Sequence, residues 1–163
     1  MNGRSGRAGR VISWPILRRE PTVTDVIALP VSVSDVCARV LMNIGACGPY
    51  AHFVARFEPP GAGGGPELLS AVPEDRLPPE FLPSVRAGLS EGLDGVAAAV
   101  LLTDGSFHAV DSSEYGYVIA GREAGRAALI GAGLLPAEEA DALRWTTWPG
   151  KPRPKKRRAA GRR

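Results

Sequence analysis

The stretch that most constrains the fold is Asp104–Gly121, which reads DGSFHAVDSSEYGYVIAG. The apolar run Val96–Thr103 precedes it and predicts a short, buried strand. Asp104-Gly105 is a turn signal, because glycine tolerates positive φ and aspartate can bond the backbone close by. The segment therefore predicts a strand that leads into a polar tip, where His108 is presented to solvent.

A helix is expected directly after this tip. Asp111 is followed three residues later by Glu114, which is the spacing of a capping box and predicts Asp111 as the N-cap. Apolar residues at helical spacing extend the helix from Ser112 to about Ala132. Three glycines weaken this helix but would let another element pack very close to it: Gly116, Gly121 and Gly125.

The first half of the chain has the patterns of β-strands. Thr22–Val33 contains a proline, so a strand there would have to lie at a sheet edge. Asp35–Met42 and Tyr50–Glu58 alternate between apolar and polar residues, and the glycine-rich Asn43–Pro49 joins them, which predicts a hairpin. One face of the second strand is expected to be apolar: Phe53, Ala55 and Phe57.

The middle and the end of the chain add a short strand and more helix. Leu68–Val72 is a short strand, an apolar stripe predicts a helix from about Pro79 to Leu93, and Pro136–Arg144 is expected to form a short third helix. The order strand, strand, helix, strand, helix indicates an α+β fold. We expect a small antiparallel or mixed sheet with two helices packed on one face.

Composition excludes several classes of protein. The 163 residues suffice for one domain, and the hydrophobic content of 44% is ordinary. No apolar run is long enough to span a membrane, and no secretory signal is evident, so we expect a cytoplasmic protein. The two cysteines, Cys37 and Cys47, are too few for a disulfide framework or a metal site, and we expect reduced thiols, no metal and no cofactor.

Charge is divided unevenly along the chain. Residues 1–20 carry five Arg and one Glu, and residues 151–163 carry eight Lys or Arg and no acid. Residues 21–150 keep 7 of the 20 basic and 16 of the 17 acidic residues, a net charge of −9. We therefore predict a disordered basic arm over 1–20, a folded domain over 21–150 and a disordered basic tail over 151–163. Such a tail is either a solvated segment or a means of neutralising phosphates.

Three patches resemble one known family. They are Gly45–His52 (GACGPYAH), Leu77–Leu89 (LPPEFLPSVRAGL) and the tip Asp104–Glu114. In that order they are similar to the GG-x-GQYGH loop, the P-x-EY-x-P-x-V-x-x-G helix and the DGS-aromatic-His tip of domain IV of elongation factor G. The resemblance covers about residues 31–133. It implies the fold of that domain, which is also the fold of the second domain of small-subunit ribosomal protein five.

The departures from the family pattern limit what the resemblance implies. Pro49 replaces the family glutamine, and Ala51 replaces a glycine. The sequence has no GxxxxGK[ST] phosphate loop, so it offers no site for GTP. We expect a stand-alone homologue that keeps the fold and the binding surface of domain IV without the GTPase. Its Arg/Ala/Gly/Pro-rich composition is typical of high-GC bacteria.

The resemblance also implies a binding surface. In relatives both loops lie at the end of domain IV that enters the decoding region, so His108 would approach the tRNA–mRNA duplex. RNA is recognised by shape, by its 2′-hydroxyls and by stacking on aromatic or histidine rings. The candidates are Ser106, Phe107 and His108 on the tip, Gly48, Pro49 and Tyr50 on the partner loop, and Lys151, Arg153, Lys155, Lys156, Arg157 and Arg158 in the tail.

Three functions are compatible with these patterns. The first is a non-catalytic protein of translation that binds RNA or the small ribosomal subunit. The alternative is a domain repurposed for protein interaction, with no ribosomal role. An enzyme is disfavoured, although His108 and Asp111 could form an acid–base pair, and Ser112 or Ser113 a nucleophile, because these groups occupy consecutive positions at a helix start.

Overall fold

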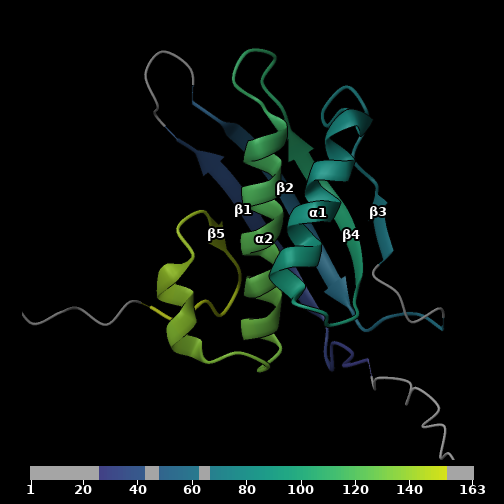
Figure 1. The fold of residues 1–163 in the computed structure, drawn as a ribbon, viewed down its shortest axis with the longest axis vertical. Helices are drawn as coiled ribbons and strands as arrows, with labels where there is room; N and C mark the ends of the chain where they lie inside the picture. The colour runs from purple at the N-terminus through teal and green to yellow at the C-terminus, as the bar shows by residue number, and fades with distance from the viewer. Residues whose placement is uncertain (1–25, 43–47, 63–66, 154–163) are drawn as a thin grey trace, which may run out of the picture.

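A five-stranded sheet forms one layer of the domain. The computed structural model describes residues 26–42, 48–62 and 67–153, so the predictions for 1–20, for 43–47 and for the tail from 154 onward lie outside the described residues. The strands run in the order β3, β4, β2, β1 and β5 across the sheet (Figure 1). Their bounds are β1 Val33–Leu41, β2 Tyr50–Glu58, β3 Glu67–Ser70, β4 Ala99–Ser106 and β5 Thr146–Thr147.

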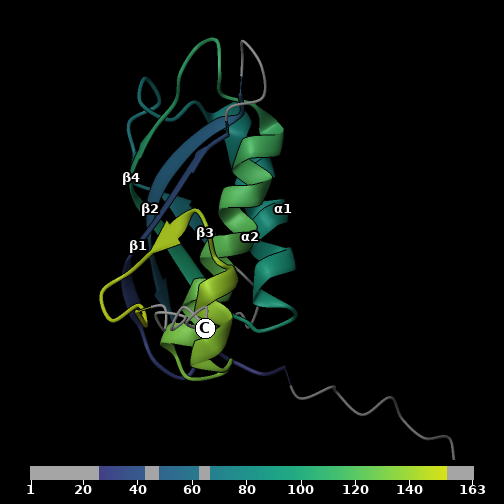
Figure 2. The same ribbon diagram turned by 90° about the vertical axis from the view of Figure 1, so that its left-hand side faces the viewer.

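The sheet is mixed. Every neighbouring pair is antiparallel except β3 and β4, which are parallel and are joined through α1 (Leu82–Leu93). The second long helix, α2 (Glu114–Gly131), follows β4. Figure 2 shows both helices on the same side of the sheet. The predicted α+β arrangement is therefore confirmed.

The core lies between the sheet and the two helices. The alternation predicted for the hairpin is confirmed, since Phe53, Ala55 and Phe57 are fully buried, and Val36 on β1 is buried beside them. The opposite face of the sheet carries no helix in the described part of the chain (Figure 2). That open face presents polar and apolar side chains side by side, among them His52 of β2.

The two helices touch through their backbones. Gly88 and Gly92 of α1 face Gly121 and Gly125 of α2. A Cβ at Gly92 would lie 2.2 Å from the carbonyl oxygen of Arg122, closer than any side chain can sit. The predicted close packing at Gly121 and Gly125 is confirmed, and α1 contributes the matching glycines.

One expectation about the strands was wrong. Strand β4 runs to Ser106, so Asp104-Gly105 lies inside a strand and not in a turn. The pairing of β2 with β4 shifts register here, and a Cβ added at Gly105 would lie 3.2 Å from the Leu77 side chain, so a glycine suits this buried position. No separate edge strand forms in the described residues of Thr22–Val33 before β1 begins, and only Ala28 makes an isolated bridge.

The end of the chain also differs from prediction. Pro136–Arg144 contains a 3-10 helix, Ala137–Ala142, and a two-residue strand, β5, follows it without a sequence signal. β5 pairs with Cys37–Ala38 at the edge of β1. The buried Trp148 and the ammonium of Lys151 fix this segment, since Lys151 Nζ donates to the carbonyls of Leu143 and Thr146 at 2.9 and 2.6 Å.

Candidate functional site

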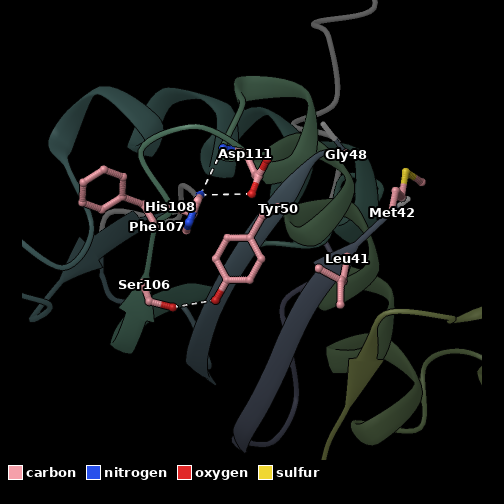
Figure 3. Close-up of a pocket in the computed structure, with 8 residues that line it drawn as sticks. All are labelled: Leu41, Met42, Gly48, Tyr50, Ser106, Phe107, His108 and Asp111. Atoms are coloured by element: carbon pink, nitrogen blue, oxygen red, sulfur yellow. Dashed lines mark hydrogen bonds and ion pairs between the residues drawn. The ribbon is translucent and has the colours of Figure 1, made fainter. Parts of the chain in front are cut away.

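A pocket of about 440 Å³ opens at the tip of the domain, where the β4–α2 loop meets the adjoining ends of β1 and β2. Most of the tip residues singled out from the sequence lie around it, and Figure 3 shows their side chains. The lining residues are Leu41, Met42, Gly48, Tyr50, Ser106, Phe107, His108 and Asp111.

Backbone hydrogen bonds hold the two sides of the pocket together. The Tyr50 N–H at the start of β2 donates to the carbonyl of Asp111 at 2.8 Å, and Tyr50 forms a parallel bridge with Ser112. Met42 N–H donates to the Pro49 carbonyl at 3.2 Å, which closes the described ends of the hairpin. The predicted partnership between the two loops therefore has a direct structural basis.

The tip loop is arranged around His108. Its backbone N–H donates to the Ser112 hydroxyl at 2.8 Å, and its carbonyl accepts from Ser112 N–H at 2.9 Å. The side chain of His108 is 59% exposed and free to meet a partner. The loop thus fixes the backbone of the histidine while its ring stays accessible.

Asp111 sets the orientation of the His108 ring. The imidazole Nδ1 lies 3.0 Å from a carboxylate oxygen of Asp111, and the Asp111 backbone N–H lies 3.3 Å from the same nitrogen. The backbone N–H donates to this nitrogen when it is unprotonated, and the carboxylate accepts from it when it is protonated, so Asp111 engages Nδ1 in either form. Nε2 is then directed away from Asp111.

Asp111 is not the N-cap that the capping-box pattern predicted. The N-cap of α2 is Ser113, whose backbone is extended and whose hydroxyl accepts from the Gly116 N–H at 3.2 Å. Glu114 is the first residue of the helix and lies in its first turn, where an acid favours the helix dipole. The side chain of Asp111 is directed to His108 instead. The spacing of residues in the sequence does not indicate whether Asp111 contacts the helix or the histidine.

A chain of hydrogen bonds leads from the pocket to the open face of the sheet. Tyr50 Oη and Ser106 Oγ lie 2.9 Å apart, and Ser106 Oγ lies 2.9 Å from His52 Nδ1. On the far side of the ring, His52 Nε2 is 3.8 Å from Cys37 Sγ. The buried Tyr117 hydroxyl donates to the carbonyl of Ser106 at 2.9 Å and so fixes the end of β4.

Burial keeps the ionisable members of this network uncharged. Desolvation is the main cause that lowers the pKa of His52, and it outweighs the opposing effect of Asp104. Burial likewise raises the pKa of the Cys37 thiol, and it raises the pKa of Tyr117 to about 12. At neutral pH the network therefore holds a neutral imidazole and a protonated thiol, and it lacks an activated nucleophile.

Phe107 supports the tip from within. Its ring centroid lies 6.4 Å from that of Phe81, which in turn lies 4.6 Å from the ring of Tyr117. Phe107 is therefore half-buried against the core as well as lining the pocket. This aromatic row connects the tip loop to the start of α1.

Charge at the pocket is negative. Asp111 is among the residues that line it, and none of these described residues is Lys or Arg. The structure does not bring Pro49 into the lining, and it places Lys151 against the carbonyls of Leu143 and Thr146. Arg153 is exposed next to Lys151, and the other tail candidates, Lys155, Lys156, Arg157 and Arg158, lie outside the described residues.

Comparison with known protein families identifies the family of this chain. A family model described as "Elongation factor G, domain IV" matches residues 33–133, which is 101 of the 163 residues. The chain belongs to the elongation factor G domain IV family. The match runs from β1 to the end of α2, so it includes both sides of the pocket. It confirms the resemblance predicted from the three sequence patches.

A solved crystal structure of a Thermus thermophilus protein is also similar to this domain IV relative. The two share 20% sequence identity with a TM-score of 0.44, over 56% of this chain and 15% of that chain. This chain therefore spans only a small part of the length of that protein. The 3-10 helix, β5 and Trp148 lie beyond the residues that the elongation factor G domain IV family matches.

Two other kinds of site are absent from the described residues. No group of three or more His, Cys, Asp or Glu among them is arranged to hold a metal ion. None of the helices described is both long enough and apolar enough to cross a membrane. The pocket at the tip is thus the place where family resemblance, exposed polar groups and aromatic rings coincide.

Proposed function

We propose that this domain IV relative binds RNA, on the small ribosomal subunit, through the pocket at its tip, and acts in translation without catalysis. The observation that carries this proposal is the meeting of both family loops in one pocket. Tyr50 and Gly48 from one loop face Ser106, Phe107 and His108 from the other.

The groups in the pocket suit contact with nucleotides. Tyr50, Phe107 and His108 offer rings for stacking, while the hydroxyl of Ser106, already bonded to Tyr50 and His52, keeps one hydrogen-bonding position for a ribose 2′-hydroxyl. Because Nδ1 of His108 is engaged by Asp111, the exposed Nε2 is the atom available to RNA. The pocket thus supplies shape and contact.

Attraction to phosphate must come from elsewhere in the chain. Residues 21–150 have a net charge of −9, whereas the basic residues concentrate in 1–20 and 151–163. Figure 1 shows that the described chain begins at the end of the domain opposite to the tip. We therefore assign the salt-sensitive part of binding to the basic ends and the specific part to the tip.

Catalysis is not needed to explain the arrangement at the tip. Asp111 holds His108, Ser113 caps α2, and Ser112 bonds the His108 backbone. Each side chain that could serve as a base or a nucleophile is therefore engaged in shaping the loop. Domain IV of elongation factor G is itself a non-catalytic domain, and the same role is assigned here.

A second candidate function is protein interaction. It is favoured by the negative charge of the domain and by the lack of a cation among the described residues that line the pocket. A basic or hydroxyl-rich protein surface would meet such a pocket without the repulsion that phosphate faces.

Sedimentation with ribosomes at low and high salt tests the proposal. The whole chain should co-sediment at low salt and dissociate as salt rises, and removal of residues 154–163, which leaves the structural Lys151 in place, should reduce this salt-dependent binding. His108→Ala should weaken binding at both salt concentrations, whereas Ser90→Ala, an exposed change on α1 outside the pocket lining, should not. Failure to co-sediment even at low salt would contradict the proposal. Capture of one non-ribosomal protein as the main partner would support the second function.

A further inference from the structure

One edge of the sheet has no partner strand among the described residues. β3 is the outermost strand on that side (Figure 1), and no described element pairs with its outer edge. Pro66 and Pro73 bound the segment in the sequence, so that only a short stretch is available for pairing. Such an edge offers unpaired backbone groups to a further strand.

The hydrogen bonds to β4 identify which backbone groups are free. Glu67 N–H donates to the Ala98 carbonyl, and Ala71 N–H donates to the Leu102 carbonyl. Backbone groups of successive residues in a strand point to opposite sides, so Leu68 and Ser70 direct their N–H and C=O groups outward. These two residues lie symmetrically on either side of Leu69.

We propose that two copies of this chain associate by pairing β3 with β3 antiparallel, about a two-fold axis at Leu69. In this register Leu68 of each copy faces Ser70 of the other, and each such pair exchanges two backbone hydrogen bonds. The two sheets would join into one continuous sheet. The proposal is independent of the function assigned to the tip.

Side chains on the open face match this register. Leu69 is 63% exposed and lies beside Leu101 of β4 in the parallel pairing, with Leu101 next to Arg56 of β2. The two-fold axis would bring the two Leu69 side chains together as a close, non-hydrogen-bonded pair. An apolar row of four leucines would then cross the junction, and a charged Arg56 would lie at each end of it.

The charged residue of the edge favours a second copy as the occupant. Glu67 would face the small, uncharged Ala71 of the other copy, so the two glutamates do not meet. On the helix side, a hollow of about 160 Å³ lies between β3 and α1, lined in part by Leu68, Leu89 and Leu93. The side chain of Ser70 from the other copy would enter over this hollow. No pairing in this register therefore places like charges opposite each other.

Analytical ultracentrifugation of the whole chain over a range of concentrations tests the association. The weight-average mass should rise from 17.1 kDa toward twice that value as concentration increases. Leu69→Lys should place two like charges at the axis and raise the midpoint concentration at least about tenfold. Val31→Lys is the control, because Val31 is a 51% exposed aliphatic residue that precedes β1 and does not line the tip pocket, and it should leave the association unchanged.

Amide exchange gives a second readout that does not depend on a variant. The amides of Leu68 and Ser70 should exchange slowly at high concentration and fast at low concentration. A mass of 17.1 kDa up to millimolar concentration would overturn the proposal. So would a dimer that Leu69→Lys leaves intact, or edge amides protected only when a different protein is added.

Discussion

The glycine contacts between α1 and α2 lead to a sharp prediction for Gly92→Ala. The added Cβ would lie 2.2 Å from the Arg122 carbonyl oxygen and 2.9 Å from its carbonyl carbon. Those atoms are backbone of a helix, so no flexible side chain can move aside, and the helices must separate. Overpacking in a core costs about 1–3 kcal/mol, and a site with only backbone around it belongs at the top of that range. Replacing glycine by alanine inside a helix stabilises the folded chain by about 0.5–1 kcal/mol, which offsets part of this cost.

The net expectation is a loss of about 2 kcal/mol in the free energy of unfolding. For a domain of this size that corresponds to a melting temperature lower by roughly 6–10 °C. Urea unfolding followed by circular dichroism measures the first quantity, and calorimetry measures the second. Gly61→Ala is the control, because nothing lies within 4 Å of its added Cβ, and it should change stability by less than about 0.5 kcal/mol. If Gly92→Ala is as stable as the unmodified chain, the proposed backbone contact is wrong.

Three further predictions concern the tip and the hydrogen-bond network behind it. Tyr117→Phe should cost about 1 kcal/mol in urea unfolding, because the Ser106 carbonyl loses its donor; an unchanged midpoint would mean that water replaces it. Ser113→Ala should lower the free energy of unfolding by about 1 kcal/mol, because the N-cap of α2 is lost. Asp111→Ala should lower it by less, and a larger loss for Asp111→Ala would show that Asp111 is the cap. Since burial lowers the pKa of His52, the unfolded chain binds its proton more readily, and stability should fall as pH falls below the ordinary value of 6.5. In His52→Asn this part of the pH dependence should vanish, and its persistence would assign it to other groups.

Periodic patterns predicted the parts of the fold that rest on burial. The alternation in β1 and β2 and the helical spacing of α2 were sufficient, because each long element must turn one face to the core. β5 escaped prediction, since two threonines have no period. Asp104-Gly105 resembles a turn locally, and only the neighbouring Leu77 and the register shift of β4 explain why it continues the strand.

The residues predicted for the candidate site coincide only in part with the lining of the pocket, which includes Leu41 and Met42 and leaves out Pro49. The tip and its partner loop were paired through family resemblance, and the structure places Tyr50, Ser106 and His108 around one pocket. The contact of His52 with Cys37 joins residues 15 apart on different strands. That pair depends on the register of β1 against β2, which alternation alone does not determine, because slipping a strand by two residues keeps the same pattern.

The short strand β5 determines what kind of assembly the sheet can form. It covers part of the outer edge of β1, with Arg39 N–H also donating to the Trp145 carbonyl. A sheet with two open edges could add copies at both sides and grow into a filament. The segment that contains β5 lies along one edge of the sheet. The β3 edge then remains to pair with another copy, so association would stop at two copies. If two copies pair through β3 as proposed, the segment Trp145–Trp148 therefore limits the assembly to two copies.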